Sequence, residues 1–208
     1  MLTDNTRVPD SSRFNDPLAS TADWSPLQRG GSSFASYRRQ VSANRFGWRP
    51  TLMVWALGGL FAAPALLVLV ALLAQGEVRP SEPASWILPV LALLFIGFGI
   101  QVVRRHKVPL VFDRLQGWFW RGTPRSNSTA DIAVLADAVK LADIHAVQLI
   151  GGQMGHGTHA SWRTFELNLV LRDGRRLPLI THGSLRVLRD DASQLAEWLS
   201  RPLWDALK

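Results

Sequence analysis

The hydrophobic positions of the chain fall into three patterns. The first pattern consists of two long uncharged apolar runs. The first run, Thr51–Ala74, has 24 residues, and the second, Trp86–Val103, has 18. At about 1.5 Å per helical residue the first reaches roughly 36 Å, enough to cross a bilayer core of roughly 30 Å, and the second is just long enough. The runs predict a transmembrane hairpin over residues 51–103, with spans 51–74 and 86–103, and the polar Gln75–Ser85 as its loop.

After the second span the spacing of apolar residues changes to two, which is typical of strands. This alternation predicts strands over Pro109–Leu115 and Gly117–Gly122, and then one or two strands over Val139–Ile150, broken near Asp143. Residues 123–131 are rich in turn-forming types and predict a loop, and the four glycines of 151–160 predict a mobile one.

The clearest predicted strand is Arg163–Arg172, because its residues alternate strictly between two faces. Phe165, Leu167, Leu169 and Leu171 share the face expected to be buried, and Glu166, Asn168 and Arg172 share the face expected to meet solvent. Asp173-Gly174 follows, and both residues tolerate the positive φ of a tight hairpin turn. The turn predicts a paired strand over Arg175–Thr181.

The third pattern is a helical stripe near the end of the chain. Its members, about 3.6 residues apart, are Leu188, Ala192, Leu195, Ala196 and Leu199. Pro202 is expected to end the helix. Since one helix after several strands must bury its stripe against their sheet, the fold class predicted is a transmembrane α-hairpin plus an α+β, mainly β, domain over residues 104–208. In that domain a bent antiparallel sheet is closed by the C-terminal helix.

Residues 1–50 lack a periodic apolar pattern and predict a flexible N-terminal cytoplasmic segment. Within it, 16–37 contains Trp24, Leu27 and Phe34, which are costly to leave exposed. Two interpretations therefore stay open for this stretch, a linker and a short docking segment. Residues 38–49 are interpreted as a short interfacial helix with Phe46 and Trp48 in the aromatic belt of the membrane.

The charges indicate the topology of the hairpin. The chain carries a formal net charge of +7, and its basic residues gather just outside both spans, whereas the loop has Arg79 offset by Glu77 and Glu82. Basic residues close to span ends stay in the cytoplasm, so both termini are expected there. Arg far exceeds Lys, and Ala, Leu and Gly are frequent, as in proteins from GC-rich bacterial genomes. The expected location is the bacterial inner membrane, as a multi-pass protein.

Several local patterns resemble bacterial membrane proteins that carry a pleckstrin-homology-like (PH-like) domain after a transmembrane hairpin. The matching stretches cover about Pro109 to Trp204. They are Val111-Phe112-Asp113-Arg114 with Gly117, Leu141-Ala142-Asp143-Ile144 with Val147-Gln148-Leu149, Glu166–Leu171 with Asp173-Gly174-Arg175-Arg176, and Asp191-Ala192, Leu195-Ala196, Leu199 and Pro202-Leu203-Trp204. The resemblance implies a scaffold or ligand-binding role and no catalysis. The phosphoinositide-binding basic cluster of eukaryotic relatives has no clear counterpart in this sequence.

Two groups of basic residues are the candidate contact sites. Residues expected to contact lipid headgroups at the membrane are Arg38, Arg39, Arg104, Arg105 and Lys107. Residues of the predicted hairpin that would form an interaction surface are Arg172, Arg175 and Arg176. From residue 104 onward 15 basic residues face 10 acidic ones, and three of the basic ones stand at the membrane exit, so nucleic-acid binding is not expected.

The sequence offers little that would support catalysis. His156 and His159 lie in the glycine-rich loop without an acidic or cysteine partner nearby, so a connecting loop is favoured over a metal site. Asp113 beside Arg114 is interpreted as turn chemistry, and Asp143 with His145 as an edge or a local hydrogen bond. No cofactor is expected, and neither span contains an ionisable residue of the kind that marks transport pathways.

The sequence therefore predicts a non-enzymatic integral membrane protein that presents a PH-like interaction domain at the cytoplasmic face and binds a protein partner. The alternative is a peripheral sensor of anionic lipid headgroups. Membrane lipids and one protein are the expected partners. The residues select neither a particular protein nor an oligomeric state.

Overall fold

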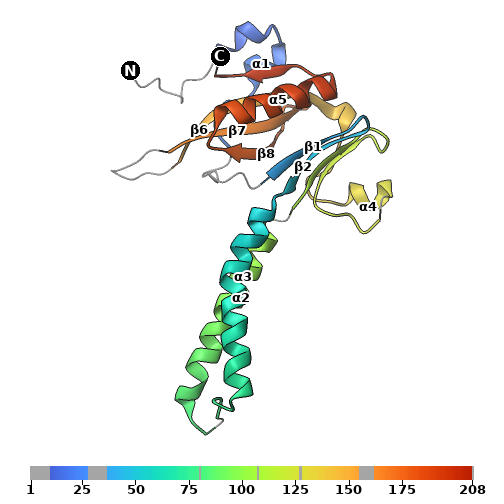
Figure 1. Ribbon diagram of the computed structural model, residues 1–208. Coiled ribbons are helices and arrows are strands. Elements are labelled where there is room, and N and C mark those ends of the chain that lie inside the picture. The colour runs from blue at the N-terminus through green and yellow to red at the C-terminus, as the bar shows by residue number, and fades with distance from the viewer. Residues whose placement is uncertain are drawn as a thin grey trace. The chain divides into compact units, whose positions relative to one another are not determined.

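The computed structural model describes residues 10–27, 37–79, 81–106, 108–126, 128–154 and 162–207. They form two compact units (Figure 1). One unit, here called the folded domain, contains the described residues before 36 together with Arg39–Trp48 and the chain from Leu110 onward. The other, the helical hairpin, is centred on Arg49–Pro109. Of the glycine-rich loop predicted over residues 151–160, residues 151–154 belong to a strand, so the prediction is wrong there. Residues 155–160, with His156 and His159, lie outside the described residues.

The helical hairpin consists of α2 (Leu52–Ala74), the short η2 (Pro83–Trp86) and α3 (Ile87–His106). Both long helices are apolar and long enough to cross a membrane, and little of either is buried within the structure. They agree closely with the two apolar runs of the sequence. Large apolar side chains such as Leu52, Leu67 and Leu94 are exposed, as expected for helices whose solvent is lipid. The two helices are therefore candidate membrane spans.

Two glycines set the closest approach of α2 to α3. A Cβ built on Gly99 would lie 2.5 Å from the Gly58 carbonyl oxygen, and one built on Gly58 would lie 2.9 Å from the Gly99 oxygen. Gly59 and Gly97, by contrast, have nothing within 4 Å of such an atom. Phe61 and Phe98 add an edge-to-face contact with centroids 5.0 Å apart. Of the four small residues in these runs, Gly58 and Gly99 permit close packing of the helices.

The first sheet of the folded domain uses chain from both sides of the hairpin. Its five strands follow in the order β1-β2-β3-β4-β5, and the hairpin enters between β2 and β3. The bounds are β1 (Tyr37–Val41), β2 (Arg45–Pro50), β3 (Leu110–Asp113), β4 (Trp118–Arg121) and β5 (Val139–Lys140). Strands β2 and β3 are antiparallel, with Arg45 opposite Asp113 and Trp48 opposite Leu110. A short helix, α4 (Thr129–Ala133), lies within the stretch predicted as a loop.

The interfacial helix predicted over residues 38–49 is wrong, because these residues form β1, β2 and their turn. Phe46 and Trp48 are each 1% exposed and do not belong to an aromatic belt. They pack with Phe112 in an aromatic core, and the Trp48 indole Nε1 donates to Asp191 Oδ2 at 2.8 Å. Burial of two large aromatic rings outweighs any preference for the membrane interface.

The second sheet has four strands in the order β8-β7-β6-β9. The bounds are β6 (Ile144–Met154), β7 (Trp162–Leu171), β8 (Arg176–His182) and β9 (Leu203–Asp205), and η3 (Leu141–Asp143) leads into β6. The predicted break near Asp143 and the Asp173-Gly174 turn are confirmed, and Gly174 has φ of +84°. The mainly antiparallel character of the domain is confirmed as well. The strands form two sheets, however, whereas a single bent sheet was predicted.

Helix α5 (Leu185–Leu199) carries the predicted stripe and packs against β6 and β7 (Figure 1). The helix was predicted to be the last element, but it is not. Strand β9 follows it and pairs parallel to β6, with Val147 opposite Leu203. Strand β9, which begins just after Pro202, has only three residues and is too short to show a periodicity.

Strand β7 is buried on both faces, which corrects the solvent face predicted for Glu166 and Asn168. The exposed fraction is 1% for Glu166 and 0% for Asn168, as low as for Leu167 and Leu169 on the other face. Arg172, just beyond the strand, is exposed. The cover over this second face is the N-terminal part of the chain.

Candidate functional site

Residues 10–27, here called the N-terminal segment, lie on one face of the four-stranded sheet. That face, here called the outer face, presents alternate residues of β6 and β7, namely Ala146, Gln148, Ile150, Glu166, Asn168 and Val170. The segment consists of the short helices η1 (Ser11–Phe14) and α1 (Pro17–Thr21) and an extended stretch to Leu27. Of the two interpretations left open for 16–37, the docking segment is confirmed for the part that is described.

The apolar half of the contact is built around Trp24. Its side chain is 9% exposed and belongs to one buried cluster with residues from the segment, β6, β7 and β9, namely Ala19, Ala146, Ile150, Val170 and Trp204. The Trp24 ring stacks on Phe14 with centroids 5.3 Å apart and planes 11° from parallel, and it lies 5.9 Å from Trp204. Its Nε1 donates to the Ala19 carbonyl at 3.1 Å, which satisfies the indole N–H.

The polar half consists of hydrogen bonds between the segment and side chains of the sheet. Asp16 Oδ2 lies 2.7 Å from His145 Nε2, and Asp23 Oδ2 accepts from Arg176 Nη2 at 2.6 Å. Main-chain groups take part as well. The Leu27 N–H donates to Glu166 Oε1 at 3.0 Å, and the Asp23 carbonyl accepts from Gln148 Nε2 at 3.1 Å. The outer face thus contacts both the side chains and the backbone of an extended segment.

These polar contacts explain why the outer face can be buried. An unsatisfied buried amide or carboxylate costs about 1–3 kcal/mol or more, and Gln148 and Asn168 are both 0% exposed. Asn168 Nδ2 donates to Gln148 Oε1 at 3.4 Å, and Arg176 Nη1 donates to the same oxygen at 3.2 Å. The carbonyl of Ser25 accepts a second bond from Arg176 Nη1 at 2.9 Å. The segment therefore supplies partners to Gln148 and Arg176, whereas the buried Asn168 Oδ1 has no hydrogen-bond partner among the described residues.

Asp23 is electrostatically adapted to its position. Hydrogen bonds from the hydroxyl and the backbone N–H of Ser25, and then the nearby charge of Arg176, hold the pKa of the Asp23 carboxyl below its usual value of 3.8. The carboxylate is therefore charged at neutral pH and available to the Arg176 guanidinium. Asp16, whose side chain accepts from the Leu18 N–H at 3.0 Å, also caps α1.

The three arginines predicted as an interaction surface differ in their surroundings. The Arg176 side chain is only 4% exposed, because the N-terminal segment covers it. Arg175 pairs with Asp173 across the turn at 2.6 Å. Arg172 donates through Nε to the Ala142 carbonyl at 2.9 Å. Arg176 thus serves internal docking, whereas Arg172 and Arg175 are exposed and their interaction role stays a prediction.

The residues predicted to contact lipid headgroups are also divided. Arg39 bonds to Asp190 at 2.8 Å and to Asp191, both on α5, so it holds β1 to the helix and is not free for lipid. Arg38 and Arg104 are exposed. The structure does not describe the Arg105 side chain or Lys107. The headgroup role thus stays a prediction, and Arg39 differs from the others in having carboxylate partners within the domain.

The suspected acid–base pairs have structural partners. Asp113 is buried, bonds to Arg45 Nε at 2.5 Å and accepts from the N–H groups of Leu115 and Gln116, which confirms the turn interpretation. His145 turns to Asp16 and does not bond to Asp143. Within the described residues, no group of three His, Asp or Glu side chains is arranged to hold a metal ion.

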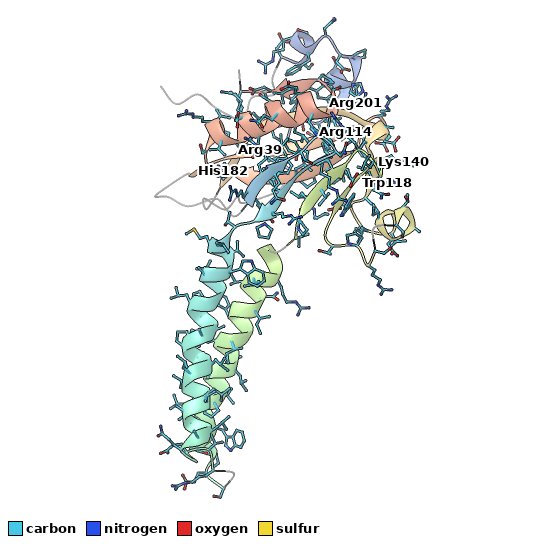
Figure 2. All side chains as sticks on the ribbon, turned by 45° about the vertical axis from the view of Figure 1, so that its right-hand side comes forward. Arg39, Arg114, Trp118, Lys140, His182 and Arg201 are labelled. Carbon is cyan, nitrogen blue, oxygen red and sulfur yellow. The ribbon has the colours of Figure 1, made fainter. Side chains whose placement is uncertain are left out.

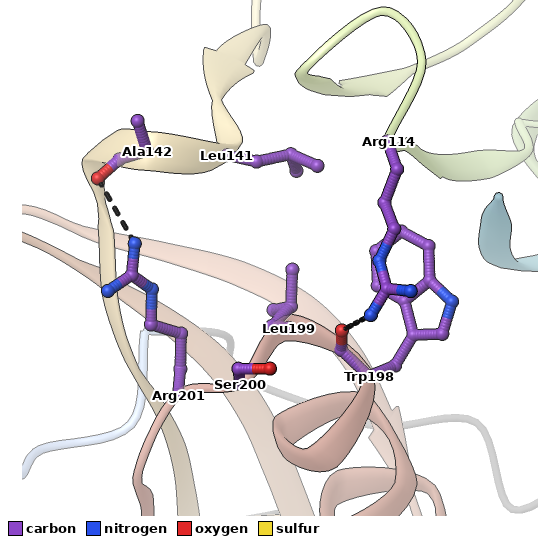
Figure 3. Close-up of a pocket in the computed structure, with 7 residues that line it drawn as sticks. All are labelled: Arg114, Leu141, Ala142, Trp198, Leu199, Ser200 and Arg201. Carbon is purple, nitrogen blue, oxygen red and sulfur yellow. Dashed lines mark hydrogen bonds between the residues drawn. The ribbon is translucent and has the colours of Figure 1, made fainter. Parts of the chain in front are cut away.

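A second feature of the folded domain is an open pocket at the C-terminal end of α5, with a volume of about 380 Å³ (Figure 3). Its lining comes from the β3–β4 turn, η3 and the end of α5, and consists of Arg114, Leu141, Ala142, Trp198, Leu199, Ser200 and Arg201. Figure 2 labels Arg114 and Arg201 at this end of the helix and Arg39 toward the other. No pocket at this place was predicted from the sequence.

The comparison with models of known protein families finds no match, and neither does the comparison with curated proteins.

Proposed function

We propose that this chain is a non-enzymatic integral membrane protein of the bacterial inner membrane that binds a protein partner through the outer face of the four-stranded sheet. In this proposal the two spans anchor a PH-like domain at the cytoplasmic face. The observation that carries it is the docked N-terminal segment, a peptide held by an aromatic anchor, side-chain contacts of two aspartates, and backbone hydrogen bonds. A face that holds one such peptide in cis has the chemistry to hold another in trans.

The contacts of the segment resemble those of peptide recognition by a sheet. Trp24 fills an apolar site and supplies large contact area at low cost in side-chain entropy, as anchor residues of interfaces do. Gln148, Glu166 and Arg176 then fix the register of the extended stretch through its main chain. A partner segment of the same kind would carry an aromatic residue next to an acidic one, as Asp23-Trp24 does.

The location at the cytoplasmic face is supported by the distribution of charge. Arg38, Arg45 and Arg49 precede the first span and Arg104 and Arg105 follow the second, whereas the loop between the spans is nearly neutral. The cost of translocating basic residues favours this orientation. The PH-like assignment is supported by two mainly antiparallel sheets with a helix packed on one of them.

The proposal is tested with a labelled synthetic peptide of residues 10–27 added to the full-length chain in detergent micelles. In the wild type the tethered segment competes at an effective concentration of about millimolar, so little peptide binds. A Trp24→Ala chain weakens its own segment, and the wild-type peptide is expected to bind it at least tenfold more tightly than it binds the wild-type chain. Fluorescence anisotropy of the label measures both.

Two neighbouring arginines provide a matched control for the site of binding. In the Trp24→Ala chain, a further Arg176→Gln is expected to weaken peptide binding at least tenfold, because Arg176 contacts Asp23 and Ser25. Arg175→Gln removes the same charge from the same hairpin, but Arg175 contacts only Asp173 among the described partners, so binding should not change. A folded Trp24→Ala chain that fails to bind the peptide would contradict the proposal.

A further inference from the structure

The arginines of the folded domain divide into two kinds according to their partners. One kind forms an ion pair with a carboxylate within the domain, and its members are Arg39, Arg45, Arg121, Arg175, Arg176 and Arg189. Three others, Arg114, Arg172 and Arg201, donate to backbone carbonyls and have no carboxylate partner among the described residues. Arg114 and Arg201 line the pocket at the C-terminal end of α5, and Arg172 shares the Ala142 carbonyl with Arg201.

Arg114 is fixed on one side of the pocket. Its guanidinium donates to the Trp198 carbonyl and, at 3.2 Å, to the Ala43 carbonyl, and it stacks over the Trp198 ring with its Cζ 4.3 Å from the centroid. These contacts hold the group in one orientation. They leave its charge without an opposing carboxylate among the described residues, since a carbonyl dipole offsets only part of a full charge.

Arg201 stands on the other side and is less well satisfied. Its Nη2 reaches the Ala142 carbonyl only at 3.5 Å, and its buried Nε has no hydrogen-bond partner among the described residues. Arg172 donates to the same Ala142 carbonyl at 2.9 Å, so a second guanidinium lies close by. Arg172 and Arg201 thus share one neutral carbonyl acceptor, and neither guanidinium has a carboxylate partner among the described residues.

The rest of the lining is compatible with an anion. The backbone of the exposed Ser200 is in the left-handed region, with φ of +54°. Its hydroxyl lies between the two arginines in Figure 3. Leu141 and Leu199 give the floor an apolar part. Two acidic residues are sequence neighbours of the lining: Asp143 follows Ala142, and Glu197 precedes Trp198. Neither of them lines the pocket. The local charge at the pocket is therefore positive, despite the carbonyls at the end of α5.

We infer that the pocket lined by Arg114, Ser200 and Arg201 is a binding site for a phosphate group. Guanidinium groups bind phosphate oxygens through paired N–H donors, and a doubly charged phosphate would offset the two charges of Arg114 and Arg201, which have no carboxylate partner among the described residues. The volume of about 380 Å³ accommodates a phosphomonoester with a small substituent. The inference does not depend on the peptide-binding role proposed for the outer face, which lies on the other sheet surface.

The test uses the full-length chain in nanodiscs of neutral phosphatidylcholine and two arms that separate the sources of phosphate. In the first arm, inorganic phosphate and glycerol 3-phosphate are titrated by calorimetry. In the second, the nanodiscs contain phosphatidic acid instead, and binding of soluble glycerol 3-phosphate is repeated, so that a lipid headgroup already in the pocket abolishes the soluble signal.

The variants are Arg201→Gln, Arg172→Gln and, as a control of equal charge, Arg175→Gln. Arg201→Gln is expected to weaken phosphate binding at least tenfold and Arg172→Gln severalfold, whereas Arg175→Gln should leave it unchanged. A soluble signal in both kinds of nanodisc assigns the site to free phosphomonoesters, and its loss in phosphatidic acid assigns it to a lipid headgroup. No saturable binding in neutral nanodiscs, or equal weakening by Arg201→Gln and Arg175→Gln, would overturn the inference.

Discussion

Trp24 and Trp204 pack ring against ring on the outer face, with centroids 5.9 Å apart and planes inclined by 39°. One indole comes from the chain before the first span and the other from the last strand. The two ends of the sequence must therefore meet before either ring is buried. This contact makes the N-terminal segment part of the folded domain, and it is the starting point for the first prediction.

Trp24→Ala is expected to lower the free energy of unfolding of the folded domain by about 3 kcal/mol, at the lower end of the range for large buried aromatic residues. The exposed fraction of 9% and the ring contacts with Phe14 and Trp204 are the reason. Leu27→Ala is the matched control, because its side chain is 42% exposed and should cost under about 0.5 kcal/mol. Chemical denaturation of the purified chain measures both, and equal losses would refute the docking.

Asn168→Asp is expected to destabilise the domain by at least about 1 kcal/mol, although alternation alone places residue 168 on a solvent face. The change removes the amide donor to Gln148 Oε1 and adds a charge where the exposed fraction is 0%. Val187→Asp adds the same charge at a side chain that is 48% exposed, and it should be nearly neutral. Melting temperatures that fall equally, or not at all, would contradict the burial of this face.

Gly99→Ala is expected to loosen the helical hairpin by about 1–3 kcal/mol, because its Cβ would meet the Gly58 carbonyl oxygen at 2.5 Å and backbone cannot move aside easily. Gly97→Ala, two residues away, meets nothing within 4 Å and should leave the hairpin unchanged or slightly more helical. Loss of the helical circular-dichroism signal on heating in detergent compares the two. A greater loss for Gly97→Ala would show that the helices pack on another face.

Docking of the N-terminal segment is expected to weaken in acid. Because the folded pKa of Asp23 lies below its usual value of 3.8, the stabilisation is complete above that value and is lost as the pH falls through the lower folded pKa. The protection factors of the amide protons of residues 18–27, taken relative to the intrinsic exchange rate at each pH, should therefore fall below about pH 4 in the wild type.

The control for this acid effect is Asp173, whose pKa is also lowered, by hydrogen bonds with Arg175, but whose side-chain partner lies within its own turn and not in the segment. Asp23→Asn should lower the protection factors of residues 18–27 at neutral pH, and these protection factors should then depend less on pH. Asp173→Asn should leave both unchanged. An Asp23→Asn chain that keeps the acid-dependent step would assign it to another group.

The sequence predicted those elements whose pattern is local. The apolar runs predicted both long helices to within about three residues, and the alternation of β7, the Asp173-Gly174 turn and the apolar stripe predicted β7, β8 and α5. The spacing of these residues reflects the period of the element that contains them. The three-residue β9 and the five-residue α4 were too short to leave such a signal.

The prediction failed where burial depends on residues distant in the sequence. Phe46 and Trp48 stand next to a span and have the composition of an aromatic belt, yet their partner Phe112 lies beyond the whole hairpin. Glu166 and Asn168 seemed solvent-facing because their cover is the N-terminal segment. Val170, an apolar residue on the same face, was the one local sign that this face is covered.

The candidate sites show the same limit. Arg39 and Arg176 were counted as free cations because composition does not reveal partners such as Asp191 and Asp23. The pocket of Arg114 and Arg201 was not foreseen, since its two arginines come from a turn and a helix end that only the fold brings together. Ionic contacts between distant residues have no periodic signature in a sequence.

The central claim is that two spans anchor the folded domain at the cytoplasmic face, and topology mapping in bacterial cells tests it most directly. A pair of reporters, one active only in the cytoplasm and one only in the periplasm, is fused in turn after Lys208 and inserted beside Glu82. The account predicts cytoplasmic activity after Lys208 and periplasmic activity at Glu82, since the basic residues flank both spans on the same side. Periplasmic activity after Lys208, or cytoplasmic activity at both positions, would contradict the account.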